Sequence, residues 1–545
     1  MQLSQNTMSS PTLTTQVLQV SQKLSLKQKR TLASKDLSYW ASEFVALERG
    51  SPLSFKDYPY LIGIYQDSHP KQVFIKATQL GLSTYAALRV IYGCINKYPL
   101  GAIYFFPTDS AISAFSKGRI TPLIENNPVS IKPYVEETDT VGLKRIKNTF
   151  LHLKGMGTRL AVLSVPADIV IFDELDNADP ELRNMARKRM SASAFKEEIS
   201  LSNPSIPGYG VDYEFQLSDQ KYFLLKCPHC GEYNCVEETF PDCLTPTGNT
   251  ITIGGRSCKE YILSCSKCKK ELDKTEGEWV AKYPKVTESS GYRLSQLISP
   301  TVSATEIYNE YKAAQMSGQL TAFYNMSLGM AYVTAREKLE VPQILALCDQ
   351  AFPEDPFKGT EVIACGIDQG ADLHVAFKKW KGKKCLTWFA IEKDFEALDK
   401  YVKLCGRVVI DALPETRLAR ALADRFPGKV FLNYYNVHQK GSVKWTEDED
   451  KADYRVEENR TESLDTSHSM WAEGINVIQA RSPEVEEFAQ HLANTAKKLD
   501  IDAETGSKRF VYIKIGPDHF RHADNYATIA LNEITSKGNG IIDYV

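Results

Sequence analysis

The sequence predicts an α/β protein with two successive α/β blocks and a small cysteine-rich β segment between them. Three observations support this fold class. Short apolar runs alternate with stretches of helical spacing from about residue 40 to 215, which is the pattern of a parallel sheet covered by helices. Two C-x-x-C pairs follow, within residues 227–268. A second alternation of strands and helices begins at "VIACGIDQG", residues 362–370.

The composition is that of an ordinary globular protein, and 545 residues leave room for several domains. A net charge of −3 gives no global positive field, so any contact with nucleic acid has to come from local basic patches. Twelve cysteines, with two C-x-x-C pairs among them, favour a reduced compartment and metal binding over a disulfide framework. We expect neither a signal peptide nor a membrane span, because no suitable apolar run occurs.

Changes of pattern along the chain predict five segments. An N-terminal Ser/Thr/Gln-rich arm precedes the first α/β domain, and a Pro/Asp-rich connector precedes the second. The predicted boundaries are 1–40 for the arm, 41–215 for the first α/β domain, 216–285 for the cysteine-rich insertion, 286–355 for a helical subdomain and linker, and 356–545 for the second α/β domain.

The stretch "VFIKATQLGLST", residues 73–84, predicts a strand that runs into a phosphate-binding loop and a helix. On the G-x-x-x-x-G-K-[ST] frame, Gly81 and Ser83 fit, but Leu82 stands where the lysine belongs. Lys76 stands where the first glycine belongs, and its long stem can bring the amine to the phosphates from the other end of the loop. Taken alone, the fragment is equally consistent with a chance strand–turn–helix.

Two further strand ends strengthen the interpretation as a nucleotide site. In "IVIFDELD", residues 169–176, Asp173 can hold the Mg²⁺ shell and Glu174 can polarise the attacking water. Ser202 and Asn203 end the next apolar strand, where polar groups can sense the γ-phosphate. This set predicts a P-loop ATPase of the ASCE type. The residues assigned to ATP binding are Lys76, Gln79, Gly81, Ser83, Thr84 and Asp173, with Glu174 catalytic and Ser202 and Asn203 coupling hydrolysis to movement.

The cysteine-rich segment predicts a metal site. "CPHC" and "CSKC" place two thiolate pairs 34 residues apart, and two such knuckles close a tetrahedral site that suits Zn²⁺. Such a site has no open position, so its role is structural. The alternative is four reduced cysteines without metal. The proposed ligands are Cys227, Cys230, Cys265 and Cys268, whereas Cys235, Cys243, Cys258 and His229 are expected to be bystanders.

The second α/β block carries a group of carboxylates. Asp368 and Asp411 end apolar strands, and Asp524 lies at the start of the last helix. Three such carboxylates can hold two Mg²⁺ or Mn²⁺ ions for phosphodiester cleavage, as in an RNase H-like nuclease. Spacing alone does not establish this, because the block contains many acidic residues, and Asp518 and Asp372 compete with Asp524.

In combination and order, these motifs resemble the large subunit of tailed-phage terminases, in the lambda-like GpA family. Members carry a variant Walker A motif whose basic residue stands at its start, as Lys76 does here. The segments "KDYPYLIGIYQD" and "LTAFYNMSLGMAY" are also similar to family blocks, and the resemblance covers roughly residues 40–540. It implies an adenine contact by Tyr58 or Tyr60. It matches the family's strand Asp-Gln pair to Asp368 and Gln369, and the family's late His-x-Asp helix start to His522 and Asp524. Leu82 departs from the pattern.

The resemblance implies an ATPase that drives double-stranded viral DNA into a procapsid and an endonuclease that cuts concatemeric genomes. Its implied cofactors are ATP-Mg, two Mg²⁺ or Mn²⁺ ions in the nuclease site and structural zinc. Its implied partners are double-stranded DNA, a small terminase subunit that the N-terminal arm could contact, the procapsid portal and further copies of the chain in a ring. It implies no membrane, and it places the protein in the host bacterial cytoplasm and transiently at the portal vertex.

Two other functions remain compatible with the sequence. One is a repair-type, helicase-like translocase with a nuclease tail. The other is a non-enzymatic, zinc-bearing DNA-binding scaffold in which Leu82 marks a dead ATP site. Basic stretches at 23–30, 182–190 and 378–384 can neutralise DNA phosphates, although each is equally consistent with a solvated charged face. For an arginine that reaches a neighbour's ATP in a ring, the candidates are Arg159, Arg183 and Arg187.

Overall fold

The computed structural model describes residues 24–538 except 48–49, 164, 335–336, 360–361, 437–438, 440, 442, 450–451 and 502–507. The chain divides into two compact units, residues 1–332 (unit 1) and 333–545 (unit 2). Residues 1–23 of the predicted N-terminal arm lie outside the described part, which begins just before helices α2 (Leu26–Ala33) and α3 (Leu37–Phe44). Among the described helices, none combines the length and apolar character that a membrane crossing requires.

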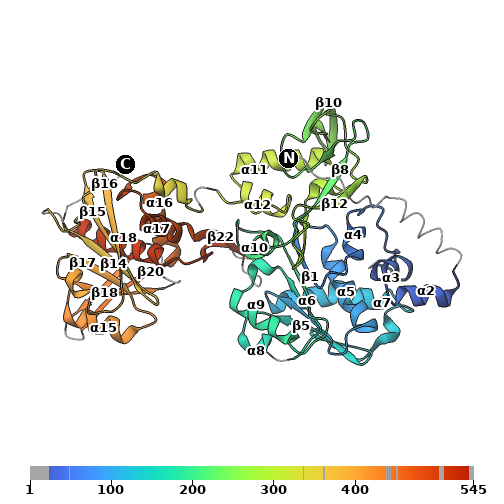
Figure 1. The fold of residues 1–545 in the computed structure, drawn as a ribbon, viewed down its shortest axis with the longest axis horizontal. Helices are drawn as coiled ribbons and strands as arrows, with labels where there is room; N and C mark the ends of the chain where they lie inside the picture. Colours follow the sequence, from blue (N-terminus) through green and yellow to red (C-terminus); the bar gives the residue numbers. More distant parts are fainter. Residues whose placement is uncertain are drawn as a thin grey trace. The chain divides into compact units, whose positions relative to one another are not determined.

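Unit 1 is built on one large mixed sheet (Figure 1). Its central strands run parallel to one another, and antiparallel strands pair at both edges. The order is β12 (Gly277–Ala281), β8 (Lys221–Lys226), β13 (Ser290–Leu294), β1 (Lys71–Lys76), β7 (Glu197–Ser202), β6 (Ile169–Asp173), β2 (Ala102–Phe106), β5 (Thr149–Gly155), β4 (Leu143–Ile146) and β3 (Val135–Asp139), and β9 (Tyr233–Asn234) pairs with β8.

The apolar runs read from the sequence become strands buried on both faces. Side chains of successive residues point to opposite faces of a sheet, so Phe74 packs in one core while Val73 and Ile75 pack in the other. Helices cover both faces. The helices beside the first core are α3, α4 (Leu61–Gln66), α5 (Leu82–Asn96), α6 (Asp109–Phe115) and α7 (Thr121–Glu125), with the π-helix η1 (Ser116–Ile120) between the last two. Those beside the second are α8 (Arg159–Val162), α9 (Pro180–Arg187) and α10 (Gly210–Gln216).

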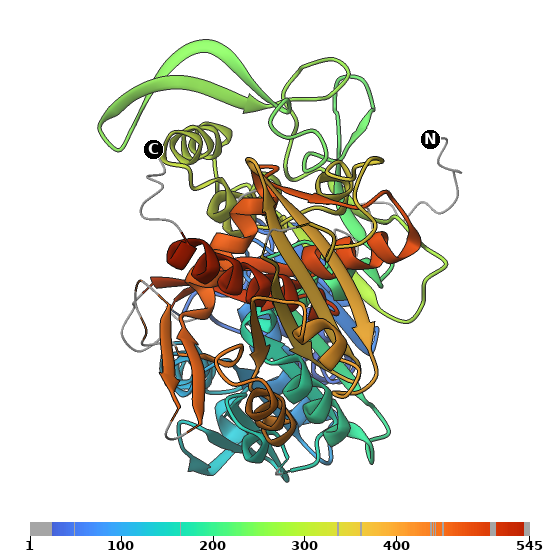
Figure 2. The same ribbon diagram turned by 90° about the vertical axis from the view of Figure 1, so that its left-hand side faces the viewer.

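The cysteine-rich and helical segments are more closely tied to this sheet than the sequence suggested. The stretch 286–355, expected to be helical, supplies β13, which pairs directly with β1. The insertion 216–285 supplies β8 and β12 at the sheet edge. Strands β10 (Leu244–Ile253) and β11 (Arg256–Leu263) form a long hairpin (Figure 2). Tyr261 of this hairpin stacks on Tyr308 of α11 (Ala304–Ser317), with ring centroids 3.7 Å apart. Helix α12 (Leu320–Met326) follows.

Unit 2 contains a second mixed sheet. β14 pairs antiparallel with β15 on one side and parallel with β17 on the other, which confirms the predicted RNase H-like α/β fold. The order is β19 (Lys444–Asp448), β20 (Asp453–Glu458), β18 (Val430–Tyr435), β17 (Arg407–Asp411), β14 (Ala364–Gln369), β15 (Leu373–Lys381), β16 (Lys384–Glu392) and β21 (Asn476–Ile478). A separate hairpin is formed by β22 (Thr495–Ile501) and β23 (Lys508–Lys514).

The last helix, α18 (His519–Gly538), crosses β14, β15 and β17 and positions the candidate nuclease residues. The backbone of α18 comes so close to β14 that a Cβ atom at Gly366 would lie 2.1 Å from the Ala527 nitrogen. Only glycine therefore allows this approach. The remaining helices of the unit are α13 (Val341–Leu345), α14 (Asp399–Val402), α15 (Thr416–Arg425), α16 (Arg460–Ala472) and α17 (Pro483–Ala493).

Candidate functional site

The phosphate loop lies between the end of β1 and the start of α5. Lys76 is the last residue of β1, and α5 begins at Leu82. Gln79 and Gly81 adopt positive φ angles of 63° and 84°, which turn the backbone sharply before the helix. Ser83 then stands in the first turn of α5, where free backbone N–H groups and the helix dipole favour an anion. The loop has the shape that phosphate binding requires.

Charged side chains gather at the carboxyl edge of this sheet. Strands β1, β7 and β6 are parallel neighbours, so their ends meet there. The Lys76 Nζ lies 3.0 Å from Glu174 Oε1, and the buried Asp173 accepts a hydrogen bond of 2.8 Å from the Tyr104 hydroxyl. Burial opposes the charge on Lys76, but Glu174 and Asp173 outweigh it and raise the pKa of this amine. Lys76 is therefore a cation at neutral pH.

The end of β7, predicted to couple hydrolysis to movement, is hydrogen-bonded to the phosphate loop. Asn203 Nδ2 donates to the Lys76 carbonyl at 2.8 Å. The Thr78 amide donates to the Met326 carbonyl at 2.8 Å, and Asn325 Nδ2 donates to the Ser205 carbonyl at 2.9 Å. The segment 320–332 thus links the phosphate loop to the end of β7. The sequence identified this block only through its resemblance to a family, without a role.

Arg119 is a residue of this site that the sequence interpretation missed. It lies in the π-helix η1, and its Nη1 donates to the hydroxyl of Thr84. Its charge also acts on Lys76, whose pKa it lowers slightly against the larger effects above. No motif signals this arginine, because tertiary packing of η1 against α5 alone brings it there. Arg119 places a second positive charge beside the phosphate loop.

The structure separates the two tyrosines that could contact the adenine. Tyr60 is fully buried, and its hydroxyl donates to the Leu80 carbonyl at 3.5 Å under the loop. Tyr58 is half-buried and lies edge-on to Tyr60, with ring centroids 6.1 Å apart. Of the pair, only Tyr58 keeps a surface that a base can contact.

The candidate trans-acting arginines differ in their partners. Arg187 is bound by Glu198 and Glu214, and Arg183, with 9% of its side chain exposed, lies 3.8 Å from Glu214. Arg159 is 72% exposed and makes one long contact of 3.4 Å to Glu181. An arginine that reaches another subunit has to be accessible, so exposure favours Arg159. The basic stretch 182–190 contributes less surface charge than its sequence suggested.

The four cysteines of the two knuckles converge. Cys227 Sγ lies 3.6 Å from Cys268 Sγ, and Cys230 Sγ lies 3.6 Å from Cys265 Sγ. All four sulfur atoms lie within 4.8 Å of one another, close to the ~3.8 Å separation in a tetrahedral zinc–thiolate site. The donor set therefore fits Zn²⁺. Three of the other cysteines make different contacts: Cys235 with Glu237, Cys243 with the Val236 carbonyl and Cys258 with the Ile251 carbonyl.

We expect Cys265→Ser to remove the zinc held by this group. One thiolate of a tetrahedral site is then missing, and a hydroxyl is a poor replacement for a soft ligand. Zinc content measured on the purified full chain should fall by one equivalent, and the melting temperature of unit 1 should fall with it. Cys258→Ser, in the neighbouring hairpin, is the matched control. Unchanged zinc content in Cys265→Ser would remove the case for a Cys₄ site.

Asp368 and Asp411 are brought together in unit 2. They end the adjacent parallel strands β14 and β17, and the Gln369 side chain donates to the Asp411 carbonyl at 2.5 Å. The Tyr526 hydroxyl of α18 donates to Asp411 Oδ2 at 3.1 Å. Burial, with the nearby charge of Asp368, raises the pKa of Asp411. Two carboxylates that repel each other at a sheet edge form a site suited to a divalent cation.

The structure does not bring Asp524 to this pair. Its carboxylate is fully buried, with Oδ1 2.8 Å from Lys378 Nζ and Oδ2 accepting from Trp471 Nε1 at 3.1 Å. The reason is helical phase. His519, the first residue of α18, contacts Asp368, and Asp524, five residues later, lies about 140° away from it around the helix. Asp518, immediately before the helix, contacts His522 at 3.4 Å, and the charge of His522 acts on Asp411. The structure therefore speaks against Asp524 as a metal ligand and leaves Asp518 as a competing candidate, although Asp518 also pairs with Lys514 at 2.8 Å.

We expect Asp524→Ala to destabilise unit 2 by about 3–5 kcal/mol, because it leaves the Lys378 ammonium buried without its partner. The double variant Asp524→Leu with Lys378→Met should recover most of that loss, since it removes both charges. Urea unfolding of the full chain, followed by the fluorescence of the nearby Trp471, measures the effect. A fully stable Asp524→Ala protein that binds less Mn²⁺ would restore Asp524 as a ligand.

The basic stretch 378–384 lies on the β15–β16 hairpin that follows Asp368. Lys378 is fully buried, and Lys379 donates to the carbonyls of Pro356 and Lys358. The exposed lysines of the stretch 378–384 lie at the β15–β16 turn. Because β15 starts beside Asp368 and runs away from it, that turn is about 24 Å from the acidic pair. These lysines do not line the acidic site.

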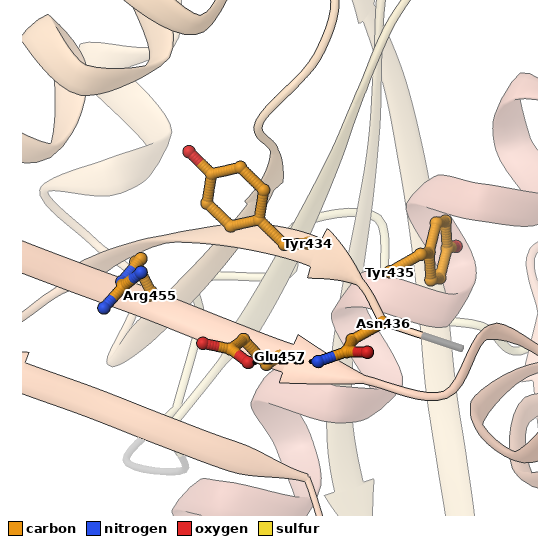
Figure 3. A pocket seen from close by; sticks show the side chains of 5 residues that line it. All are labelled: Tyr434, Tyr435, Asn436, Arg455 and Glu457. Atoms are coloured by element: carbon orange, nitrogen blue, oxygen red, sulfur yellow. Dashed lines mark hydrogen bonds between the residues drawn. The ribbon is translucent and has the colours of Figure 1, made fainter. Parts of the chain in front are cut away.

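A pocket of about 350 Å³ lies at the ends of β18 and β20 (Figure 3). Its lining residues are Tyr434, Tyr435, Asn436, Arg455 and Glu457. Tyr434 and Tyr435 point to opposite sides of β18 (Figure 3). The Tyr435 hydroxyl lies 2.9 Å from His522 Nδ1, so the pocket is connected to the residues around Asp411.

Comparison with known proteins gives matches over both units. Residues 49–282 match the family model described as phage terminase large subunit gpA, ATPase domain, and residues 289–402 match the model described as terminase large subunit gpA, endonuclease domain. The terminase large subunit of Enterobacteria phage P21 is 26% identical over 267 residues, or 44% of this chain. The match spans 41% of that relative's length.

Among solved structures, the large terminase of a thermophilic bacteriophage shares 11% identity over 86% of this chain and 94% of its own, with a TM-score of 0.30. The large terminase ATPase domain of Thermus phage P74-26 shares 12% identity over 50% of this chain and 92% of its own, also with a TM-score of 0.30. At this level they add nothing to the assignment, which rests on the two family models. These models cover more than half of the chain between them, and the chain therefore belongs to the gpA family of phage terminase large subunits.

Proposed function

We propose that the protein uses ATP hydrolysis to move double-stranded viral DNA into a procapsid and cuts the concatemeric genome with a metal-dependent nuclease. One observation carries the proposal. A single chain combines the Lys76, Asp173 and Glu174 group at the carboxyl edge of one sheet with the Asp368 and Asp411 pair at the edge of another. A protein that both moves DNA and cuts it needs an ATPase site and a nuclease site.

In the ATPase site, each side chain has a distinct task. Glu174 accepts the proton of the attacking water, and Lys76 and Arg119 stabilise the charge that develops on the phosphates. Magnesium would be held by Ser83 and Asp173, and it would offset the negative charge of the nucleotide phosphates. The Lys76–Glu174 ion pair has to open when a triphosphate enters, and the Asn203 bond to the Lys76 carbonyl transmits that change to β7.

In the nuclease site, Asp368 and Asp411 would hold the Mg²⁺ or Mn²⁺ ions, with Asp518 as the third carboxylate. When bound, such ions would activate a water molecule and offset the negative charge of the leaving oxygen. Tyr526 fixes the orientation of Asp411 through its hydroxyl, and Tyr435 does the same for His522. The zinc of the Cys₄ group would hold the two knuckles together and takes no part in either reaction.

The partners follow from this function: double-stranded DNA, a small terminase subunit, the procapsid portal and other copies of the chain in a ring, within the bacterial host cell. The test is a packaging reaction with purified protein, procapsids of the same virus, the small subunit and linear DNA. ATP-dependent protection of the DNA from an added DNase supports the proposal. Exposed Arg159 is the candidate to reach a neighbouring ATP site in such a ring.

The competing functions give other outcomes in the same assay. A repair-type translocase hydrolyses ATP with DNA but gains nothing from procapsids. A non-enzymatic scaffold hydrolyses no ATP at all. The charged arrangement of Lys76, Asp173 and Glu174 favours an active ATPase over the scaffold. Lys76 supplies the positive charge that is missing at position 82, where leucine replaces the usual lysine.

A further inference from the structure

Two histidines and an aspartate meet at the end of β14. His374 of β15 is the direct cross-strand neighbour of Asp368, and His519 begins α18. The His519 Nδ1 lies 2.8 Å from Asp368 Oδ2. The rings of His374 and His519 stack with centroids 4.7 Å apart and an angle of 17° between planes. One ligand atom from each of the three residues lies within 4.8 Å of the others.

The surroundings leave a nitrogen lone pair available on His374. Its Nδ1 lies 3.3 Å from the Asp372 carbonyl oxygen. A carbonyl can only accept, so Nδ1 carries the proton and Nε2 carries the lone pair. A ring nitrogen that donates to a backbone carbonyl while the other binds metal is the usual arrangement of a metal-ligating histidine. The neighbouring His491 is engaged differently, since its Nδ1 accepts from the Phe520 amide at 3.4 Å.

The turn between β14 and β15 makes room for this group. A Cβ atom at Gly370 would lie 2.8 Å from the Cε1 atom of the His519 ring. Any other residue at this position would push His519 away from Asp368. His374 and Asp368 are buried, whereas the His519 side chain is 31% exposed, so an ion can enter from the His519 side. Ligand atoms around one ion are about 3 Å apart, and small side-chain rotations close the remaining distance.

We propose that Asp368, His374 and His519 form a binding site for a nitrogen-preferring divalent metal ion, of which Zn²⁺ is the type. Two imidazoles and one carboxylate suit zinc and other transition metals, whereas Mg²⁺ prefers oxygen ligands alone. The ion displaces the proton that His519 and Asp368 share. The site adjoins the oxygen-only Asp368–Asp411 pair and shares Asp368 with it, and in this respect the inference rests on the proposed nuclease.

Zinc binding to the full-length chain tests the site without any assay of DNA cleavage. Cys265→Ser provides a background without the thiolate site. In equilibrium dialysis against micromolar Zn²⁺ with millimolar Mg²⁺ present, this protein should keep one equivalent of zinc. Adding His374→Ala or His519→Ala should remove that equivalent or weaken its affinity at least 10-fold. His522→Asn, one turn further along α18, is the matched control and should retain it. Equal zinc content with and without His374 and His519 would overturn the proposal.

A second measurement needs no variant, in case His374→Ala does not fold. Crystals of the wild-type chain soaked in Zn²⁺ should show an anomalous peak, at the zinc absorption edge, between the three side chains. A clean map without that peak would overturn the site. Failure of the nuclease proposal is distinguishable, because Asp411→Asn should lose cleavage and keep this zinc. If no protein cuts DNA but the zinc is bound, the metal site stands and the nuclease assignment falls.

Discussion

Glu174→Gln is expected to lower DNA-stimulated ATP hydrolysis by about 10²- to 10⁴-fold, the usual contribution of a general base. Glutamine keeps the shape of the side chain but cannot accept the proton. Lys76→Ala should have an effect at least as large, because the loop has leucine where a lysine usually stands. ATP turnover measured with and without double-stranded DNA gives both values. Nicking of plasmid DNA with Mn²⁺ should be unchanged in both variants.

Lys71→Ala is the matched control for the lysine variant. It lies on the same strand as Lys76 but at its other end, so it tests loss of a charge without loss of the site. Normal ATP turnover in Lys76→Ala would refute the view that this amine supplies the missing cation. A nucleotide-bound structure with Lys76 still paired to Glu174 would refute it as well.

Asp368→Asn is expected to abolish DNA cleavage and leave ATP hydrolysis intact. The side chain stands beside both Asp411 and His519, so its loss affects every metal position proposed for this edge of the sheet. Loss of a metal ligand costs several kcal/mol of transition-state stabilisation, which corresponds to a drop of about 10³-fold or more. The rate of conversion of supercoiled plasmid to nicked and linear forms, in Mg²⁺ and in Mn²⁺, measures it.

Asp372→Ala is the control for this variant. Asp372 follows Asp368 by four residues, but its carboxylate faces outward and pairs with Lys393 at 2.8 Å. Cleavage should survive this change. Asp518→Ala should lose cleavage while the protein remains folded. Undiminished cutting by Asp368→Asn would exclude the nuclease assignment for this sheet edge.

The convergence of the candidate ATPase residues was largely predictable from the sequence, because these residues follow local patterns of the chain. Lys76, Asp173 and Ser202 each end a buried strand, and parallel strands bring such ends to one edge regardless of the detailed packing. The same holds for Asp368 and Asp411, and for the cysteine pairs, whose two-residue spacing fixes a knuckle. In each case the local motif and the sheet topology together determine the position.

Only the tertiary structure shows which residues from other parts of the chain join these sites and sheets. Arg119 reaches Thr84 through a π-helix that no motif marks, and β13 enters the sheet from a stretch that has helical neighbours. The sequence placed Asp524 at the start of a helix, but not the face of the helix on which it lies. Gly366 allows α18 to pack closely on β14. In that packing, Asp524 faces Lys378 and His519 faces Asp368. The residue that ends a strand is determined by the local sequence. The face that a helix turns toward a site depends instead on the elements against which the helix packs.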